Sequence, residues 1–383
     1  MWRHIASNAL SLFVVILIVA GGMVAWAQSQ YRADGPLSEA ICLRVQPGAT
    51  MRSVSAELSE RGAISSGTLF RLGADYSEKA SLLKAGSFLV PAGGSMAEIV
   101  DIVTRGGAST CGTEIVLRIG VNSARLQLRE LDPATGRFVE KANFLPEEAA
   151  PAVYDAARDQ SDTRYRIALA EGATSWQIIT ALRGADFLVD DVSATPAEGI
   201  LAPDSYEVRA GSRISALVAD MSERQAAILA EAWAGRDADL PLASAQEALI
   251  LASIVEKETG LAEERKQVAS VFVNRLNRGI RLQTDPTVIY GVTDGRGNLG
   301  RGLRQSELRR ETPFNTYVIN GLPPTPIANP GRAAIEAVLS PDDTPYLFFV
   351  ADGTGGHAFA ETLREHNANV AKWRAIEAQN NDN

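Results

Sequence analysis

Two carboxylates near the end of an apolar stretch are the residues of this chain best suited to acid–base chemistry. Glu256 and Glu258 follow an apolar run from Ala248 to Val255. Residues two apart point to nearly opposite sides of a helix, so the pair is not expected to share one cleft. A carboxyl group stacked over apolar neighbours is partly desolvated, which raises its pKa and suits a general acid. The competing interpretation of Glu256 and Glu258 is a charged, solvated helix end.

The helix that must position these carboxylates is predicted from about residue 245 to residue 259. Ser244 and Glu247 have the S-x-x-E spacing of a capping box, which is typical of a helix start. Gly260 follows the last periodic residue, where a glycine can adopt the left-handed conformation that ends a helix. Because most residues between these ends are apolar, the helix is expected to pack on most of its sides.

A second group of polar residues lies after Gly279, on segments that are predicted to be irregular. The segment 321–331 contains four prolines and two glycines, which favours a rigid, non-helical wall. Amide, hydroxyl and aromatic groups on rigid loops are what a sugar-binding cleft needs. The alternative for each residue is a local role in a turn or loop. The candidates are Gln283, Thr284, Asp285, Asn315 and Tyr317.

The composition is that of a globular protein and argues against nucleic-acid binding and metal sites. The chain has 383 residues, of which 46% are hydrophobic and 22% are charged, so it is long enough for two or three globular domains. A net charge of −9 argues against non-specific binding to nucleic acid, which needs a basic surface. The cysteines and histidines have no metal-ligand spacing, so we predict neither a metal site nor a cofactor.

The N-terminal segment is predicted to be a membrane anchor. An apolar run over residues 9–27 is about long enough to cross a bilayer as a helix. Arg3 precedes it, so the positive-inside rule favours a cytoplasmic tail over residues 1–8 and an exported remainder. A cleaved signal peptide is the alternative, because Ala25-Trp-Ala27 fits a cleavage site. Export would permit a disulfide between Cys42 and Cys111, and two free thiols are an equal alternative.

The rest of the chain divides into segments of different pattern. Residues 28–40 are predicted to be a polar linker. Residues 41–107 form a small α+β unit whose first strand, turn and helix resemble a LysM carbohydrate-binding module; any small strand-helix-helix unit is the alternative. Residues 108–164 are predicted to be a β-rich insertion, and residues 165–383 a mixed α/β domain. In the latter, a strand, the turn 171–174 and a helix repeat the pattern at 45–58.

Several motifs together resemble the endolytic murein transglycosylase family, which is also called YceG-like. The resemblance is dense from about residue 199 to residue 369 and looser upstream, and residues 108–164 resemble an insertion relative to shorter members. The motifs that carry it are Ala252-Ser-Ile-Val-Glu-Lys-Glu-Thr259, Val268-Ala-Ser-Val-Phe-Val-Asn-Arg275, Leu282-Gln-Thr-Asp-Pro-Thr-Val-Ile-Tyr290, Asn315-Thr-Tyr317, Gly321-Leu-Pro-Pro-x-Pro-Ile327, Tyr346-Leu-Phe-Phe-Val-Ala-Asp-Gly353 and Gly356-His-x-Phe359.

The resemblance implies an α+β chain with an N-terminal membrane helix, a LysM-like module over 41–107 and a catalytic domain over 165–383. It implies a single-pass inner-membrane protein whose catalytic domain lies in the periplasm and acts on peptidoglycan glycan strands. Peptidoglycan synthases are candidate partners. The family's catalytic glutamate falls on Glu256. Residues expected to bind substrate or support the site are Glu258, Gln283, Thr284, Asp285, Asn315 and Tyr317.

The implied reaction cleaves the bond between N-acetylmuramic acid and N-acetylglucosamine, leaves a 1,6-anhydromuramic end and so terminates nascent strands. Ordinary glycosidases use two carboxylates. Here Glu256 alone could protonate the glycosidic oxygen and then accept the proton of the muramic 6-hydroxyl, because that nucleophile is intramolecular. The alternatives are a hydrolytic muramidase, with Asp285 activating water, and an inactive peptidoglycan-binding scaffold.

Overall fold

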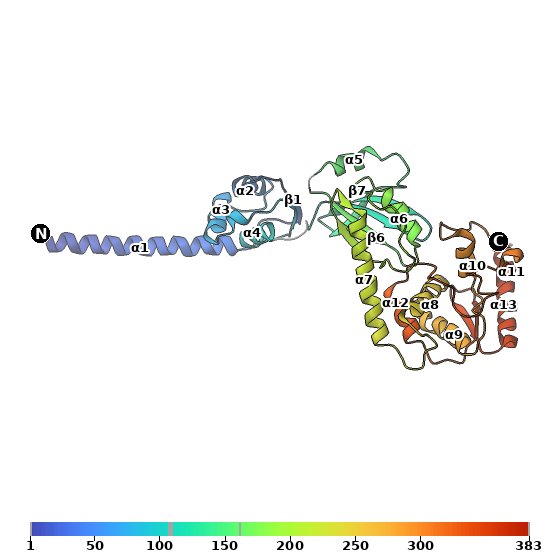
Figure 1. Ribbon diagram of the computed structural model, residues 1–383. Coiled ribbons are helices and arrows are strands. Elements are labelled where there is room, and N and C mark those ends of the chain that lie inside the picture. The colour runs from blue at the N-terminus through green and yellow to red at the C-terminus, as the bar shows by residue number, and fades with distance from the viewer. Residues whose placement is uncertain (1, 106–109, 161, 382–383) are drawn as a thin grey trace. The chain divides into compact units, whose positions relative to one another are not determined.

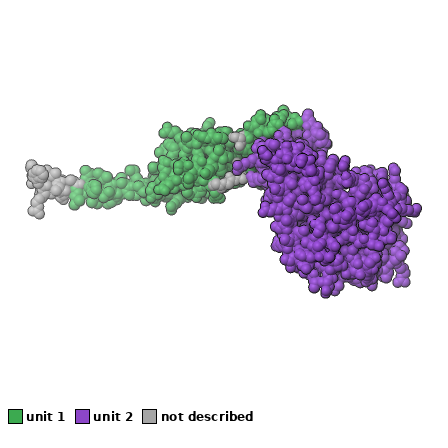
Figure 2. Space-filling model, in the orientation of Figure 1, with its two compact units in different colours: residues 1–115, 127–143, 150–164 green, residues 116–126, 144–149, 165–383 purple. Residues whose placement is uncertain are grey.

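The computed structural model describes residues 2–105, 110–160 and 162–381 of the chain. The chain divides into two compact units (Figure 2): unit 1 comprises residues 1–115, 127–143 and 150–164, and unit 2 comprises residues 116–126, 144–149 and 165–383. Helices and short strands occur in both units (Figure 1), which confirms the predicted α+β class.

The N-terminal helix α1 (Trp2–Arg32) belongs to unit 1. Its stretch Leu10–Arg32 has a mean hydropathy of 2.5, and in the described part of the chain it is the one helix long and apolar enough to span a membrane. α1 continues past Ala27 into the predicted linker, because no glycine or proline occurs between Ala27 and Gly35. A single-pass anchor fits this helix, and a signal sequence has the same length and composition.

A small module follows α1 in the order strand, helix, helix, strand, helix, as the sequence predicts. The two strands pair antiparallel, with Ile41 opposite Val90. Leu43 and Phe70 are fully buried in the core between this hairpin and the helices. Its likeness to a LysM module stays a prediction. The elements are β1 (Ile41–Val45), α2 (Met51–Glu60), α3 (Gly67–Tyr76), η1 (Ala80–Leu82), β2 (Gly86–Val90) and α4 (Met96–Thr104).

A disulfide joins Cys42 of β1 to Cys111, with Cα atoms 5.7 Å apart. The sequence left this pairing open, because it does not reveal which residues lie close together. The bond links positions separated by 69 residues. A cross-link of this kind restricts the unfolded chain and stabilises the folded one by about 2–5 kcal/mol.

A five-stranded sheet has the order β5-β4-β3-β6-β8. β6 and β8 are antiparallel, with Tyr165 opposite Val208. The segment 108–164 supplies β3, β4, β5 and the short helix α5 (Ala152–Arg158). The two units divide this segment between them, so its description as one insertion stays a prediction. The strands are β3 (Thr113–Ile119), β4 (Ala124–Asp132), β5 (Arg137–Phe144), β6 (Arg164–Leu169) and β8 (Ser205–Val208).

In unit 2 the helix that carries Glu256 lies inside a layer of helices (Figure 1). Every residue of α8 from Ala248 to Val255 is buried, which confirms that this helix packs on most of its sides. α8 (Ala245–Glu258) contacts α7 (Ile214–Ala234), α9 (Arg265–Asn277), α10 (Asp285–Thr293) and α12 (Arg332–Leu339). The other elements are α6 (Ser175–Arg183), β7 (Leu188–Val189), β9 (Ser212–Arg213), α11 (Gln305–Arg309), β10 (Phe348–Ala351), β11 (His357–Ala360) and α13 (Leu363–Asn381).

The segment after Gly279 is more helical than predicted. α10 begins at Asp285, and Pro286 lies in its first turn. A proline suits that position because the first turn of a helix leaves its N–H groups unpaired, so Asp-Pro here begins a helix rather than a free turn. The segment 321–331 is non-helical, as predicted, and α12 begins directly after Gly331.

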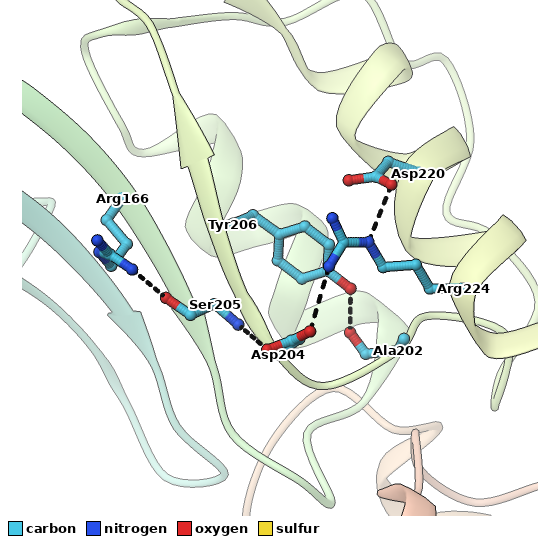
Figure 3. A network of polar contacts seen from close by, with 7 residues as sticks. All are labelled: Arg166, Ala202, Asp204, Ser205, Tyr206, Asp220 and Arg224. Atoms are coloured by element: carbon cyan, nitrogen blue, oxygen red, sulfur yellow. Dashed lines mark hydrogen bonds and ion pairs between the residues drawn. The ribbon is translucent and has the colours of Figure 1, made fainter. Parts of the chain in front are cut away.

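A polar network connects the loop before β8 with α7 (Figure 3). The buried Tyr206 hydroxyl donates a hydrogen bond to the Ala202 carbonyl oxygen at 2.7 Å. Arg224 donates to Asp204 at 3.2 Å and to Asp220 at 3.0 Å, and its guanidinium lies 4.8 Å from the Tyr206 ring centroid. Exposed ion pairs contribute little singly, so the buried tyrosine is the main anchor of this network.

Candidate active site

Glu256 lies in the last turn of α8, at the edge of the buried core. At the start of the helix, Ser244 accepts the N–H of Glu247 at 3.2 Å, as the predicted cap requires. The Glu247 carboxylate binds the N–H of the residue before Ser244, so the capping box is incomplete. At the other end Thr259 is extended, and Gly260 is not among the described glycines with positive φ. The predicted left-handed glycine end is therefore wrong, because an extended residue already ends the helix.

The Glu256 side chain is partly exposed, and its Oε2 accepts a hydrogen bond from the N–H of Gly331 at 3.0 Å. Burial raises the pKa of Glu256 above its ordinary value, and the Gly331 N–H opposes that increase. The Glu171 carboxylate raises the pKa further, whereas the cations of Arg265 and Lys257 lower it. The balance favours the protonated acid more than in a free glutamate.

The proline-rich segment 321–331 brings Gly331 to Glu256. The Ile327 N–H donates to the Ser253 hydroxyl of α8 at 3.0 Å. Asn329 is fully buried; its side-chain Nδ2 donates to the Ala173 carbonyl at 3.0 Å, and its backbone carbonyl accepts the Gly172 N–H at 2.9 Å. These bonds attach the segment both to α8 and to the turn after β6, so that Gly331 and this turn approach Glu256 together.

Glu171 is a carboxylate near Glu256 that the sequence did not single out. It is exposed and lies in the turn after β6, followed by Gly172 at φ +78°. Its side chain covers Gly331: a Cβ added to Gly331 would lie 1.8 Å from Glu171 Oε1. Only a glycine leaves room for this arrangement. The repeated strand-turn-helix pattern at 164–182 was the signal in the sequence, but it does not reveal that the turn meets α8.

A further carboxylate, Glu198, is partly buried and interacts with Lys257. Glu198 Oε1 accepts the Ser175 N–H at 2.6 Å, and its Oε2 accepts the Tyr290 hydroxyl at 3.2 Å. Burial raises the pKa of Glu198 and lowers the pKa of Lys257. Lys257 Nζ donates to the Gly172 carbonyl at 3.3 Å, and the charges of Glu256 and Glu198 both favour its cation. Lys257 thus fixes the turn that carries Glu171.

Glu258 belongs to a different group of side chains. The Thr284 hydroxyl donates to Glu258 Oε1, and the Tyr317 hydroxyl donates to Asp285 Oδ1 at 2.7 Å. Burial raises the pKa of Glu258, with Asp285 adding to the increase and Arg275 opposing it. The group surrounds a cavity of about 180 Å³. Its lining residues are Glu258, Phe272, Arg275, Leu282, Gln283, Thr284, Asp285, Tyr317 and Phe349.

The remaining predicted residue, Asn315, is fully buried and lines neither group. Its side-chain amide donates to the carbonyls of Glu307, Leu308 and Arg310, at 3.1, 3.1 and 2.7 Å, and its Oδ1 accepts the Tyr317 N–H at 3.0 Å. Asn315 therefore satisfies loop backbone, which is the alternative stated for it above. Its bond to the Tyr317 N–H connects it to the Glu258 group through the backbone.

The predicted residues thus do not share one cleft: Glu256 stands apart from the Glu258 group, and Asn315 lines neither. Within the described residues, none of the six predicted to support the site donates a hydrogen bond to Glu256, whose carboxylate is bound by Gly331. The i, i+2 spacing of the two glutamates correctly indicated different surroundings. In the described ranges no cluster of three or more histidine, cysteine, aspartate or glutamate side chains could hold a metal ion.

Comparisons with known proteins bear on the family of the chain. A sequence model of the YceG-like family matches residues 43–372. A Bacillus subtilis protein named endolytic murein transglycosylase is 42% identical over 137 residues, which are 36% of each chain. A Streptococcus pneumoniae protein of the same name is 25% identical over 388 residues, covering 96% of this chain and 65% of the relative. The chain therefore spans less than two thirds of the length of either relative. A solved YceG-like protein from Listeria monocytogenes aligns with a TM-score of 0.46 and 25% identity, over 86% of this chain and 99% of that one.

Proposed function

Because the chain belongs to the YceG-like family, we propose that it is a lytic transglycosylase that cleaves the glycan strands of peptidoglycan. The names of the two curated relatives support this reaction and substrate. The observation that carries the proposal is the state of Glu256, a partly exposed acid with a raised pKa and one backbone donor on its carboxylate. Such an acid keeps its proton to higher pH than a free glutamate does and can release it to a leaving group.

In the first step the protonated Glu256 gives its proton to the oxygen between N-acetylmuramic acid and N-acetylglucosamine. The bond between this oxygen and the muramic anomeric carbon breaks, and the freed N-acetylglucosamine keeps the oxygen as a hydroxyl. The Gly331 N–H donates to the carboxylate that forms, which stabilises it as charge develops. Positive charge develops at the same time on the anomeric carbon.

In the second step the muramic 6-hydroxyl attacks its own anomeric carbon. The Glu256 carboxylate accepts the proton of that hydroxyl, so the acid is restored and the strand ends in a 1,6-anhydro sugar. Water is not consumed, and because the nucleophile belongs to the substrate, no second carboxylate is needed to activate it.

Glu171 adjusts the acid rather than replacing it. Its negative charge, held against Gly331, favours the neutral form of Glu256 before the first step. It also favours the positive charge that develops on the sugar. Arg265 and Lys257 oppose the first effect, so the pKa of Glu256 depends on all three charges.

The group around Glu258 supports the end of α8 and the loop that follows α9. Its hydroxyl and carboxylate groups bond to one another, and Arg275 donates to the carbonyls of Leu282 and Leu347 at 2.6 and 2.7 Å. We therefore assign a supporting role to Glu258, Gln283, Thr284, Asp285, Asn315 and Tyr317.

The proposal places this chemistry outside the inner membrane. α1 would anchor the chain as a single-pass helix, with a LysM-like module over 41–107 and the domain over 165–383 both in the periplasm. An oxidising compartment is also where a Cys42–Cys111 disulfide persists. Termination of nascent strands near peptidoglycan synthases would follow from an anchor in the same membrane.

Product analysis tests this function. Full-length protein in detergent is incubated with polymeric glycan strands, and the products are read by mass spectrometry for wild type and for Glu256→Gln. Anhydro ends that are absent with Glu256→Gln support the proposal. Reducing ends would instead indicate a muramidase, in which Asp285 would activate water. Binding without cleavage by wild type would indicate a peptidoglycan-binding scaffold.

A further inference from the structure

A groove in unit 2 lies apart from both carboxylate groups. It encloses about 480 Å³ and is formed by α6, the turn between β3 and β4, residues 145–147 and residues 296–297. This volume falls in the range of about 300–1,000 Å³ that small-molecule and saccharide sites occupy. None of the predicted site residues lines this groove, and the proposed mechanism assigns it no role.

An exposed tryptophan is the main feature of this groove. Trp176, in the first turn of α6, keeps 37% of its surface exposed. Ile119 and Ala181 form a buried apolar floor beside it, and the polar side chains of Asn122 and Arg296 line the rim. An indole face above an apolar floor suits the C–H face of a pyranose ring, and the rim can bind its hydroxyl and acetamido groups.

The edge of the groove lies near Glu256 through two contacts. Gln177, which lines the groove, donates through its side-chain Nε2 to the Val121 carbonyl at 2.8 Å. A Cβ on Gly172 would lie 3.5 Å from Val121 Cγ1 and 3.6 Å from Glu256 Cγ. A single glycine therefore separates the edge of the groove from the proposed acid. A glycan strand bound at Glu256 can reach the groove within a few sugar residues.

The structure of α6 holds Trp176 in place. Thr174 caps the helix, accepting the Gln177 N–H at 3.2 Å, while the Gln177 side chain accepts the Thr174 N–H at 2.9 Å. The Thr174 hydroxyl also donates to the Gly295 carbonyl at 2.6 Å, which fixes the neighbouring loop that forms the rim. Hydrogen bonds from α6 and its cap thus hold the two neighbouring loops, and a preformed site loses less entropy when a ligand binds.

We propose that this groove is a remote subsite that binds a sugar ring of the β-1,4-linked N-acetylated glycan strand, with Trp176 stacked on the ring. The inference rests on the proposed function for the identity of the strand. It adds a second place on the protein, distant from the cleaved bond, at which the same strand is bound. Such a subsite increases affinity for long strands over short fragments and leaves the reacting atoms untouched.

Binding to an inactivated chain tests the subsite separately from catalysis. Full-length Glu256→Gln protein in detergent is titrated by calorimetry with a β-1,4-linked N-acetylglucosamine oligosaccharide. Adding Trp176→Ala is expected to raise the dissociation constant about tenfold, because aromatic stacking and the buried ring area are lost. Trp176→Tyr should restore most of the affinity. Trp373→Ala, which removes a partly exposed tryptophan of α13, is the matched control and should change nothing.

A second variant covers the case in which Trp176→Ala fails to fold. Thr180 is exposed on α6 and lines the groove, so Thr180→Arg fills the groove without altering the core. It is expected to weaken oligosaccharide binding by a similar factor. In the active chain, Trp176→Ala should raise KM for polymeric strands about tenfold and leave kcat within about twofold.

The outcomes separate the subsite from the proposed function. Oligosaccharide binding that Trp176→Ala and Thr180→Arg leave unchanged would overturn the subsite, as would an absence of binding to the Glu256→Gln chain. If both variants weaken binding but wild type cuts no strand, the proposed function fails and the saccharide site stands. If wild type yields anhydro products and both variants bind and cut normally, the function stands and the subsite fails.

Discussion

Glu256 and Glu258 lie two residues apart on one helix, yet their carboxyl groups have different surroundings. Burial raises the pKa of both. Glu256 is bound by a backbone N–H and lies close to the exposed Glu171, whereas Glu258 is bound by the Thr284 hydroxyl in a group of mutually bonded side chains. A raised pKa therefore does not distinguish a reacting acid from a supporting one; the donors and the access around the carboxyl group do.

The largest expected effect is the difference between the two glutamine substitutions. Glu256→Gln should lower kcat by about 10³-fold or more, because one residue serves as acid and then as base. Glu258→Gln should retain activity within about tenfold, since an amide oxygen can still accept the Thr284 hydroxyl. The rate of anhydro-product release measures both. Equal losses would mean that the Glu258 group takes part in the chemistry.

Gly331→Ala is expected to be next in size. The added Cβ would lie 1.8 Å from Glu171 Oε1, so Glu171 and the Gly331 N–H must both shift. We expect kcat to fall about 10- to 100-fold, because the proton donor loses its alignment. Gly260→Ala is the matched control: its Cβ meets nothing within 4 Å and its φ is not positive. Equal activity of the two alanine variants would contradict the role given to Gly331.

Glu171→Gln should shift a pH profile. Removal of the negative charge lowers the pKa of Glu256, while Arg265 and Lys257 still favour the ionised form. In the pH profile of kcat/KM, the alkaline limb reports loss of the proton from Glu256, and it should therefore move to lower pH. At pH values above this limb, kcat/KM should fall about two- to tenfold relative to wild type. Glu263→Gln removes an exposed carboxylate before α9 and should leave the profile in place. A Glu171→Gln profile identical to wild type would exclude electrostatic coupling.

A stability effect should appear on the Glu258 side. The pKa of Glu258 is raised in the folded state, so the folded protein binds this proton more tightly than the unfolded protein does. Proton binding therefore stabilises the fold at low pH, and this contribution is lost as pH rises through the folded-state pKa. Thr284→Val removes the donor that favours the ionised form. It should lower the free energy of unfolding by about 1–3 kcal/mol, and by more above that pKa than below it. Urea unfolding at acidic and alkaline pH tests this, and a loss that decreases with pH would contradict it.

The smallest effect is expected for Tyr317→Phe. It removes the hydroxyl that donates to Asp285 Oδ1 at 2.7 Å and leaves the ring in place. Since Asp285 can bind water instead, the free energy of unfolding should change by about 1 kcal/mol or less, with activity preserved. A large loss of activity on glycan strands would show that the Glu258 cavity binds substrate.

Local pattern was sufficient for the helix that carries the acid and for the direction of its two glutamates. The apolar run from Ala248 to Val255 and the Ser244 cap can each be recognised from neighbouring residues alone. In the structure the run is buried and Ser244 caps the helix. It was insufficient at Asp285, where the same Asp-Pro pair can form a turn or begin a helix. Packing of α10 on α8 decides between them.

The partners of Glu256 could not be predicted from local sequence. Glu171 and Gly331 come from segments far before and far after α8, and their meeting depends on the buried Asn329 that links both. Asn315 shows the converse case: it was predicted to bind substrate or support the site, and its side-chain amide donates to backbone carbonyls of its own loop. For Glu256 the deciding contacts join segments far apart in the sequence, whereas for Asn315 they lie within its own loop.

The order of these segments along the chain has a consequence during synthesis. Glu171 emerges first and Glu256 later, but the N–H that binds Glu256 belongs to Gly331, at the start of the last helix that packs on α8. Until that residue has left the ribosome, the Glu256 carboxylate lacks this hydrogen bond. A chain whose synthesis stops before this point therefore carries Glu256 without the N–H that binds its carboxylate.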